Sequence, residues 1–258
     1  MLLLLSPAKT LDYDSPGHVA ARGAPPFTAR AAELIDLMRG YSPAQVAQLM
    51  DLSDNLAALN VGRYGAWSMR HTRKNSKAAV LAFAGDVYDG LDAKSLAEDD
   101  FDWAQEHLGI LSGLYGLLRP LDALQPYRLE MGTRLPNAHG KDLYAFWGDT
   151  LSQELNRRLR KDPAPLIVNL ASQEYFKAVA PKALKVPVLE CVFEEWKAGQ
   201  WKIVSFFAKR ARGLMARYVI EQRATQAEQL KGFDAEGYAF APEASQPQRW
   251  VFRRRTTG

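Results

Sequence analysis

Cationic side chains are most concentrated between residues 202 and 223. This stretch carries one carboxylate, that of Glu221, and six basic residues: Lys202, Lys209, Arg210, Arg212, Arg217 and Arg223. An arginine guanidinium offers a fixed fork of N–H donors that matches phosphate oxygens. A local field of this sign favours a polyanionic ligand, either nucleic acid or a phosphorylated small molecule.

The same stretch is expected to be helical from Ala208 to about Arg223. Arg210 and Arg217 would form a ridge beside the apolar face of this helix. Lys209 and Arg212 would also lie away from the centre of that face. The residues predicted to make that face are Ala211, Met215, Tyr218 and Val219. The alternative is a solvated helix face without a ligand, which the scarcity of neighbouring acids disfavours.

A second possible phosphate contact is the glycine-bounded segment Gly113-Leu114-Tyr115-Gly116. It resembles the hairpin of a helix-hairpin-helix motif, in which Gly113 and Gly116 would let backbone N–H groups approach a phosphate. Pro120 departs from that pattern, because it would fall near the start of the second helix. A plain glycine turn between packed segments explains the spacing equally well.

Isolated basic residues beside turns complete the candidate set. Lys9 follows the apolar run Leu2–Leu5, and Arg128 and Lys177 lie in short segments that mix charges with aromatic residues. These residues could contact phosphates, or Glu130 could neutralise Arg128 in an ion pair with no ligand. A different hypothesis is an enzyme acting on a nucleotide-like or phosphorylated small molecule.

In that enzyme, Lys9 would bind the phosphate and Asp86 or Glu130 would act as general acid or base. Loops that bind nucleotides or carry a hydrolase nucleophile have known glycine spacings, and none occurs in this sequence. We therefore expect no catalytic residues, and a non-enzymatic binding protein is the favoured interpretation.

Metal and thiol chemistry lack the residue spacings that they require. The four histidines are scattered through the sequence, at His18, His71, His107 and His139, and form no metal-binding motif. Cys191 is the single cysteine and alternates with apolar residues on a predicted strand, which indicates a buried, unreactive thiol. We expect no metal and no cofactor.

Composition is that of an ordinary globular protein. Hydrophobic residues make up 47% and charged residues 24% of the 258 residues, enough to bury a sizeable core. We expect one domain over residues 1–258.

The start of the sequence has no basic region before Leu2–Leu5, and Pro7 follows, so a signal peptide or membrane span is not expected. The predicted location is the cytoplasm, with no membrane association and no obligate protein partner.

Local patterns predict a mixed α/β (α+β) fold. Strands are expected at Leu2–Leu5, 77–83 and 165–170, with a hairpin formed by 188–193 and 201–207. Besides the basic helix, two helices are expected over roughly 30–60, one from Asp99 to about Gly113, and one over 143–159.

Several long strings, in order along nearly the whole chain, resemble the YaaA family of bacterial peroxide-stress proteins. They are Leu5–Tyr13, Gly85–Tyr88, Leu111–Asp122, Gln125–Gly132 and Ala208–Met215. The resemblance implies a cytosolic protein that limits iron and peroxide damage and protects DNA. It also implies a family-specific fold that binds DNA through a basic cleft and a helix-hairpin-helix-like element. Our own hypothesis adds that the phosphate contacts are made largely regardless of base sequence.

The DNA-binding residues come partly from this resemblance. Those implied by the family motifs are Lys9, Gly113, Gly116, Arg128, Lys209, Arg210 and Arg212. Lys177 and Arg217 are added from the placement of charge. If the hypothesis is right, these cations converge in the folded chain into a continuous trough wide enough for a duplex.

Overall fold

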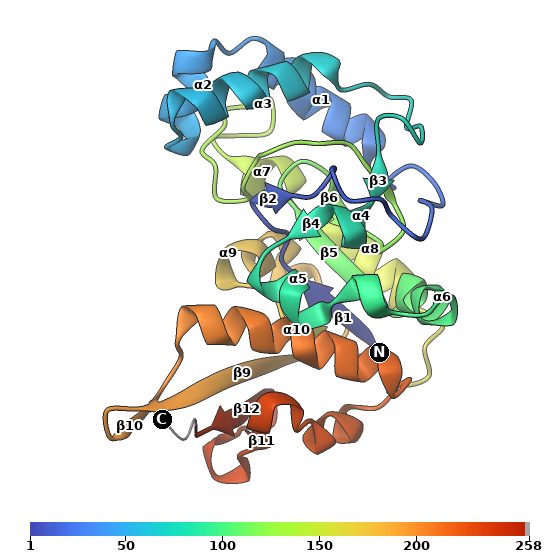
Figure 1. Cartoon of the computed structure of the whole chain (residues 1–258), viewed down its shortest axis with the longest axis vertical. Coiled ribbons are helices and arrows are strands. Elements are labelled where there is room, and N and C mark those ends of the chain that lie inside the picture. The colour runs from blue at the N-terminus through green and yellow to red at the C-terminus, as the bar shows by residue number, and fades with distance from the viewer. Residues whose placement is uncertain (256–258) are drawn as a thin grey trace.

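A mostly parallel sheet forms the centre of the molecule in the computed structural model, which describes residues 1–255 (Figure 1). Its eight strands run in the order β11-β12-β9-β8-β1-β5-β6, with β10 paired to β9. They are β1 (Leu2–Leu5), β5 (Leu108–Ser112), β6 (Gly116–Leu118), β8 (Ile167–Asn169), β9 (Val188–Lys197), β10 (Gln200–Lys202), β11 (Ala239–Phe240) and β12 (Arg249–Arg254).

The first strand occupies the middle of this sheet. All four leucines of β1 are buried, as expected for a parallel strand that is covered on both faces. β1 pairs in parallel with β5 on one side, where Leu3 faces Leu108, and with β8 on the other, where Leu2 faces Ile167. After β1, the chain forms β5 on one side of it and later forms β8 on its other side, so the order of strand addition reverses at β1. In open α/β sheets, ligands bind at the carboxyl ends of the strands at such a point.

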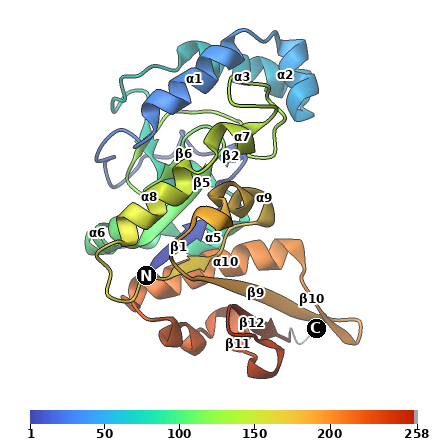
Figure 2. The same cartoon turned by 180° about the vertical axis from the view of Figure 1, so that it is seen from behind.

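Helices lie on both faces of the sheet and form a further layer beyond its β6 side (Figures 1 and 2). α10 crosses one face and packs on β9, whereas α8 lies on the opposite face. The helices are α1 (Thr28–Arg39), α2 (Pro43–Met50), α3 (Asp54–Ala66), α4 (Ala79–Ala82), α5 (Asp86–Leu91), α6 (Glu98–His107), α7 (Leu143–Trp147), α8 (Thr150–Leu159), α9 (Gln173–Phe176) and α10 (Ser205–Glu221).

Short elements connect these layers. Two small antiparallel pairs join β2 (Thr10–Leu11) to β4 (Phe83–Ala84) and β3 (Lys77–Ala78) to β7 (Ala123–Leu124). Short 3-10 helices are η1 (Ala93–Ser95), η2 (Lys177–Val179), η3 (Pro181–Ala183), η4 (Ala227–Gly232), η5 (Ala235–Gly237) and η6 (Pro242–Ala244).

Helices α5 and α10 approach each other closely through two glycines. A methyl group on Gly213 would overlap the carbonyl oxygen of Val87, and one on Gly90 would overlap the carbonyl oxygen of Arg210. Because neither residue has a side chain, the two backbones can touch. This contact fixes the start of α5, where Asp86 lies, against α10, where Lys209 lies.

The mixed α/β class predicted from the sequence is confirmed, together with several of its elements. Leu2–Leu5 is a strand, and the basic helix is α10. The expected hairpin is formed by β9 and β10, but its second strand ends at Lys202 rather than 207, because α10 already begins at Ser205. Cys191 is buried on β9, and burial raises the pKa of its thiol far above the ordinary value. This thiol therefore stays protonated and unreactive.

Other expected elements are wrong in type or extent. The strand predicted over 77–83 is two short strands separated by the single turn α4, and the predicted helix from Asp99 ends at His107, where β5 begins. The helix expected over 143–159 is two helices, because Gly148 adopts a positive φ of 47° between them. Three helices, rather than two, cover residues 28–66.

Candidate functional site

Polar side chains from distant segments meet where β1 ends. Lys9 follows β1, and its Nζ lies 3.5 Å from Oε1 of Glu130. The same oxygen accepts a hydrogen bond from Nε of Arg128 at 3.0 Å. Nζ of Lys209 lies 3.9 Å from Oδ2 of Asp86. A Cβ on Gly85 would lie 3.8 Å from that of Ala8, so these two ion pairs lie on adjacent segments. We call Lys9, Asp86, Arg128, Glu130 and Lys209 the carboxyl-edge site.

Two serines fix the backbone at the end of β1. Oγ of Ser6 accepts a hydrogen bond from the backbone N–H of Ser172 at 2.9 Å, which ties the exit of β1 to the exit of β8. The hydroxyl of Tyr88 donates to the carbonyl of Ser6 at 3.0 Å. The segment that carries Lys9 is therefore held from β8 and from α5.

Buried tyrosines form the floor of this site. Tyr127 and Tyr175 line a shallow pocket together with Lys9, Arg128 and Glu130. Burial is the main cause that raises the pKa of Tyr88, Tyr127 and Tyr175 well above the ordinary value. These phenols stay neutral at physiological pH and act as hydrogen-bonding groups beneath the charged residues.

Glu130 is held in place through one carboxylate oxygen, while its other oxygen has no hydrogen-bond partner in the described chain. Its Oε1 contacts both Arg128 and Lys9, whereas its Oε2 is buried and has no hydrogen-bond partner among residues 1–255. Arg128 is also immobilised, since only 16% of its side chain is exposed and its carbonyl accepts a hydrogen bond from Tyr64. By contrast, the exposed fractions are 69% for Lys9 and 52% for Lys209, so these lysines can reorient.

The predicted helix-hairpin-helix is not found at Gly113 and Gly116. The two glycines lie in the buried turn between strands β5 and β6, so no helix flanks the turn on either side. A methyl group on Gly113 would overlap the carbonyl of Leu129, and one on Gly116 would lie 2.7 Å from the Trp147 ring. The leucines at 108 and 111, which were expected to continue a helix, are strand residues. Gly113 permits close packing against the backbone of Leu129 and Glu130, and Gly116 permits it against Trp147.

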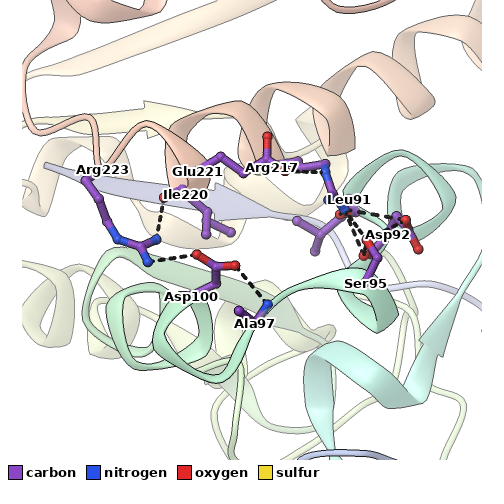
Figure 3. Close-up of polar contacts among 9 residues, drawn as sticks. All are labelled: Leu91, Asp92, Ser95, Ala97, Asp100, Arg217, Ile220, Glu221 and Arg223. Atoms are coloured by element: carbon purple, nitrogen blue, oxygen red, sulfur yellow. Dashed lines mark hydrogen bonds and ion pairs between the residues drawn. The ribbon is translucent and has the colours of Figure 1, made fainter.

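Two predicted DNA-binding arginines are engaged by acids: Arg210 by one from a neighbouring element, and Arg217 by one from α10 itself. Nη2 of Arg210 lies 2.6 Å from Oε1 of Glu236. Nε of Arg217 lies 2.8 Å from Oε1 of Glu221, and its Nη1 donates to the Asp92 carbonyl at 3.0 Å and to Oγ of Ser95 at 2.7 Å (Figure 3). In the same view Arg223 contacts Asp100 of α6 at 2.7 Å. These contacts fasten α10 to its neighbours.

Arg212 lies on the buried face of α10, whereas the sequence pattern placed it off the apolar centre. Residues one turn away on either side, Ala208 and Ala216, are both buried. The buried face is wider than predicted because the Gly213 side also packs, against α5. Burial lowers the pKa of Arg212, and the carboxylate of Glu190 opposes that shift. Arg212 has no ion pair among the described residues.

Lys177 forms no ion pair with the acids of the carboxyl-edge site. Its Nζ lies 4.5 Å from the centre of the Tyr144 ring, in a cation–π contact. The structure thus pairs Lys9 and Arg128 with Glu130, and Lys209 with Asp86 on an adjacent segment. It does not place Arg210 and Arg217 on an open ridge.

The sequence patterns did not single out two features. One is the Ser6–Ser172 contact, which joins residues far apart in the chain and leaves no local signal. The other is the basic segment from Arg70 to Lys77, which contains no acid and could have been found from its charge alone.

Neither a metal-binding cluster nor a membrane-spanning helix occurs within residues 1–255. No group of three or more histidine, cysteine, aspartate or glutamate side chains is arranged to hold a metal ion there. No helix in that range combines the length and the hydropathy needed to cross a bilayer.

The fold and site define a mixed α/β protein with a polar site at the carboxyl edge of a largely parallel sheet. The family model described as peroxide stress protein YaaA matches residues 1–244, and the chain belongs to this family. The resemblance seen in the sequence is therefore confirmed.

Curated relatives that are similar over almost their whole length carry the description UPF0246 protein. One from Leptothrix cholodnii is 64% identical over 254 residues, and one from Albidiferax ferrireducens is 63% identical over 254 residues; each match covers 98% of both chains. A third, from Ralstonia pickettii, is 61% identical over 257 residues and is covered completely, as is this chain.

Proposed function

We propose that this peroxide-stress protein is cytoplasmic and binds DNA phosphates at the carboxyl-edge site, largely regardless of base sequence, and so helps to limit iron and peroxide damage. The observation that supports this most directly is the gathering of Lys9, Arg128 and Lys209 from three separate segments of the chain. They lie where the topology of an open α/β sheet favours ligand binding.

The ion pairs at this site are compatible with phosphate binding. Exposed ion pairs contribute only about 0 to 1 kcal/mol, so Lys9 and Lys209 can exchange Glu130 and Asp86 for a phosphate at little cost. Arg128, which is largely buried, serves to position Glu130. Arg212, half-buried and without an ion pair in the described chain, adds positive potential from α10.

Fluorescence anisotropy over a salt series tests this proposal. Removing one cation that contacts a phosphate lowers the slope of log affinity against log salt by about one, so Lys9→Ala combined with Lys209→Ala should lower it by about two. The matched control is Lys182→Ala with Lys185→Ala, which removes the same charge from exposed positions outside the site. Equal slopes for the two double variants would contradict the proposal, as would absent binding by the unmodified chain.

A second candidate function is an enzyme that acts on a nucleotide-like or phosphorylated small molecule at the same site. It is favoured by the ion pair of Lys9 with Glu130 and by the buried Oε2 of Glu130, which has no hydrogen-bond partner in the described chain. Thermal-shift measurements with nucleotides at low salt discriminate the two functions. Stabilisation that Glu130→Gln abolishes would favour the enzyme, whereas no shift with any nucleotide would favour DNA binding.

Several narrower expectations accompany this proposal. One domain spanning 1–258, a continuous basic cleft and the lack of an obligate protein partner stay predictions. Size-exclusion chromatography with light scattering tests the last of these directly, because an obligate complex would not give the mass of one chain.

A further inference from the structure

A second cationic region lies away from the acids of the carboxyl-edge site. Arg70, Arg73 and Lys74 are exposed, and none has a carboxylate within ion-pair distance in the described part of the chain. Lys9, Arg128, Lys209, Arg210 and Arg217 all have such partners. This loop therefore carries positive charge that is not neutralised by a neighbouring carboxylate, as do Arg212 and Lys177 elsewhere in the described chain.

The loop is held in one shape by its own side chains. Oδ1 of Asn75 accepts a hydrogen bond from the Thr72 N–H at 2.7 Å, and its Nδ2 donates to the Arg70 carbonyl at 2.9 Å. The hydroxyl of Ser76 donates to the Thr72 carbonyl at 2.6 Å. Gln125 anchors the start of the loop, because its Nε2 donates to the Ser68 carbonyl at 2.7 Å. A preformed loop loses little conformational entropy when it binds a ligand.

This loop forms one wall of a cavity of about 680 Å³. The opposite wall is the irregular segment from Tyr13 to Ala24. Lys77 joins the two walls, since its Nζ donates to the carbonyls of Asp12 and Ser15 at 2.8 and 2.9 Å. The volume falls within the range of roughly 300 to 1,000 Å³ that is typical of small-molecule sites.

The cavity lining mixes polar and apolar residues, and its charged groups are cationic. It includes Arg73 and Lys74, hydroxyl groups from Ser15 and Thr72, and no aspartate or glutamate among residues 1–255. Burial lowers the pKa of His71, so this imidazole stays neutral. The positive charge available to a ligand thus comes from Arg73 and Lys74, while Lys77 is occupied by the opposite wall.

We infer that this cavity binds a small molecule carrying a phosphate monoester, with Arg73 and Lys74 on the phosphate and the Tyr13–Ala24 segment around the organic part. Two cationic side chains and neighbouring hydroxyl donors suit the charge and the acceptor oxygens of a phosphate. A partly open site of this volume, with two walls, fits a small ligand better than the backbone of a duplex. The inference is independent of DNA binding at the carboxyl-edge site.

Isothermal titration calorimetry of the full chain at low salt tests the inference. The probes are inorganic phosphate, ribose 5-phosphate, adenosine 5′-monophosphate and adenosine. At least one phosphate ester should bind more tightly than inorganic phosphate, and adenosine should not bind. Arg73→Ala with Lys74→Ala should weaken that ester by at least roughly tenfold, because the variant cannot make two charge-assisted hydrogen bonds to the phosphate. Both residues are exposed, so folding should be retained.

Control variants make the outcome decisive. Lys182→Ala with Lys185→Ala removes equal charge elsewhere, and Lys9→Ala with Lys209→Ala disables the carboxyl-edge site; both should bind the ester as the unmodified chain does. The inference is overturned if no phosphate ester binds, or if Arg73→Ala with Lys74→Ala binds it with unchanged affinity. It is also overturned if that variant loses affinity only for a DNA duplex, since the loop would then be a nucleic-acid contact.

Discussion

At the level of single residues, Lys9 and Arg128 share one carboxylate, that of Glu130. The sequence identified the basic residues, and it raised the pairing of Arg128 with Glu130 as one alternative. It could not indicate that Arg210 pairs with Glu236, because that ion pair depends on how η5 packs on α10. Charge counted along the chain therefore overestimates the charge that a ligand meets.

A buried ion pair near the C-terminus allows a quantitative prediction. Arg254 and Glu195 are in contact at 3.1 Å with only 8% and 4% of their side chains exposed, and the Tyr238 hydroxyl also donates to Glu195. Arg254→Met leaves the carboxylate buried without its cation, and it should lower the free energy of unfolding by roughly 3 to 5 kcal/mol. Urea unfolding measures this loss.

The neighbouring Arg253 provides the control. Its side chain pairs with Glu194 and with the exposed Glu243. Arg253→Met should therefore cost less than about 1 kcal/mol. Equal losses for the two variants would show that the buried pair is not formed.

Asp12 gives a prediction about pH. A hydrogen bond from Lys94 and another from the Ser15 backbone hold the pKa of Asp12 well below its ordinary value. Because the folded-state pKa is the lower one, the stabilisation is fully present above the unfolded pKa of about 3.9 and is lost as the pH falls below it. Asp12→Asn should be less stable than the unmodified chain at pH 7, with the difference shrinking towards pH 3. A constant difference in urea unfolding across that range would contradict this assignment.

At the level of elements, hydrophobic periodicity correctly predicted the strand and the helix whose surroundings stay the same along their length. β1 is covered on both faces, and α10 keeps one side on the sheet along its length, so both were recognised. The pattern failed where a segment changes its environment within a few residues. The segment 77–83 passes from β3 through α4 to β4, and Gly148 divides α7 from α8. Packing against distant residues decides these cases, and no local pattern reports it.

Alanine substitutions at two helical glycines should have opposite effects on stability, because only one of these glycines lies at the crossing of α5 and α10. Gly213→Ala would force a methyl group into the Val87 carbonyl, and it should destabilise the fold by roughly 1 to 3 kcal/mol or more. Gly62 of α3 has open space around its missing Cβ, so Gly62→Ala should instead stabilise by about 0.5 to 1 kcal/mol through helix propensity. Thermal unfolding monitored by circular dichroism shows whether each substitution raises or lowers the stability. Stabilisation by Gly213→Ala would contradict the close crossing of α5 and α10.

At the level of the whole molecule, the sheet order determines where the functional residues meet. β1 lies between β5 and β8 although about 100 and 160 residues separate it from them. Such non-local pairings cannot be read from local sequence patterns. The sequence offered Lys9 with Asp86 or Glu130 only as a hypothetical enzyme site, and the ion pair between Lys9 and Glu130 came from the structure. Family resemblance supplied Lys9, Arg128 and Lys209 as a set, and the fold explains why they belong together.

The central claim is that DNA contacts the segments around Lys9, Asp86 and Lys209. Hydrogen–deuterium exchange of the full chain with and without a duplex at low salt tests it most directly. The account predicts slower exchange in Ala8–Thr10, at the start of α5 and in the first turns of α10, with little change in the loop from Arg70 to Lys77. Protection confined to other segments, or none at all under conditions where the duplex is bound, would contradict it.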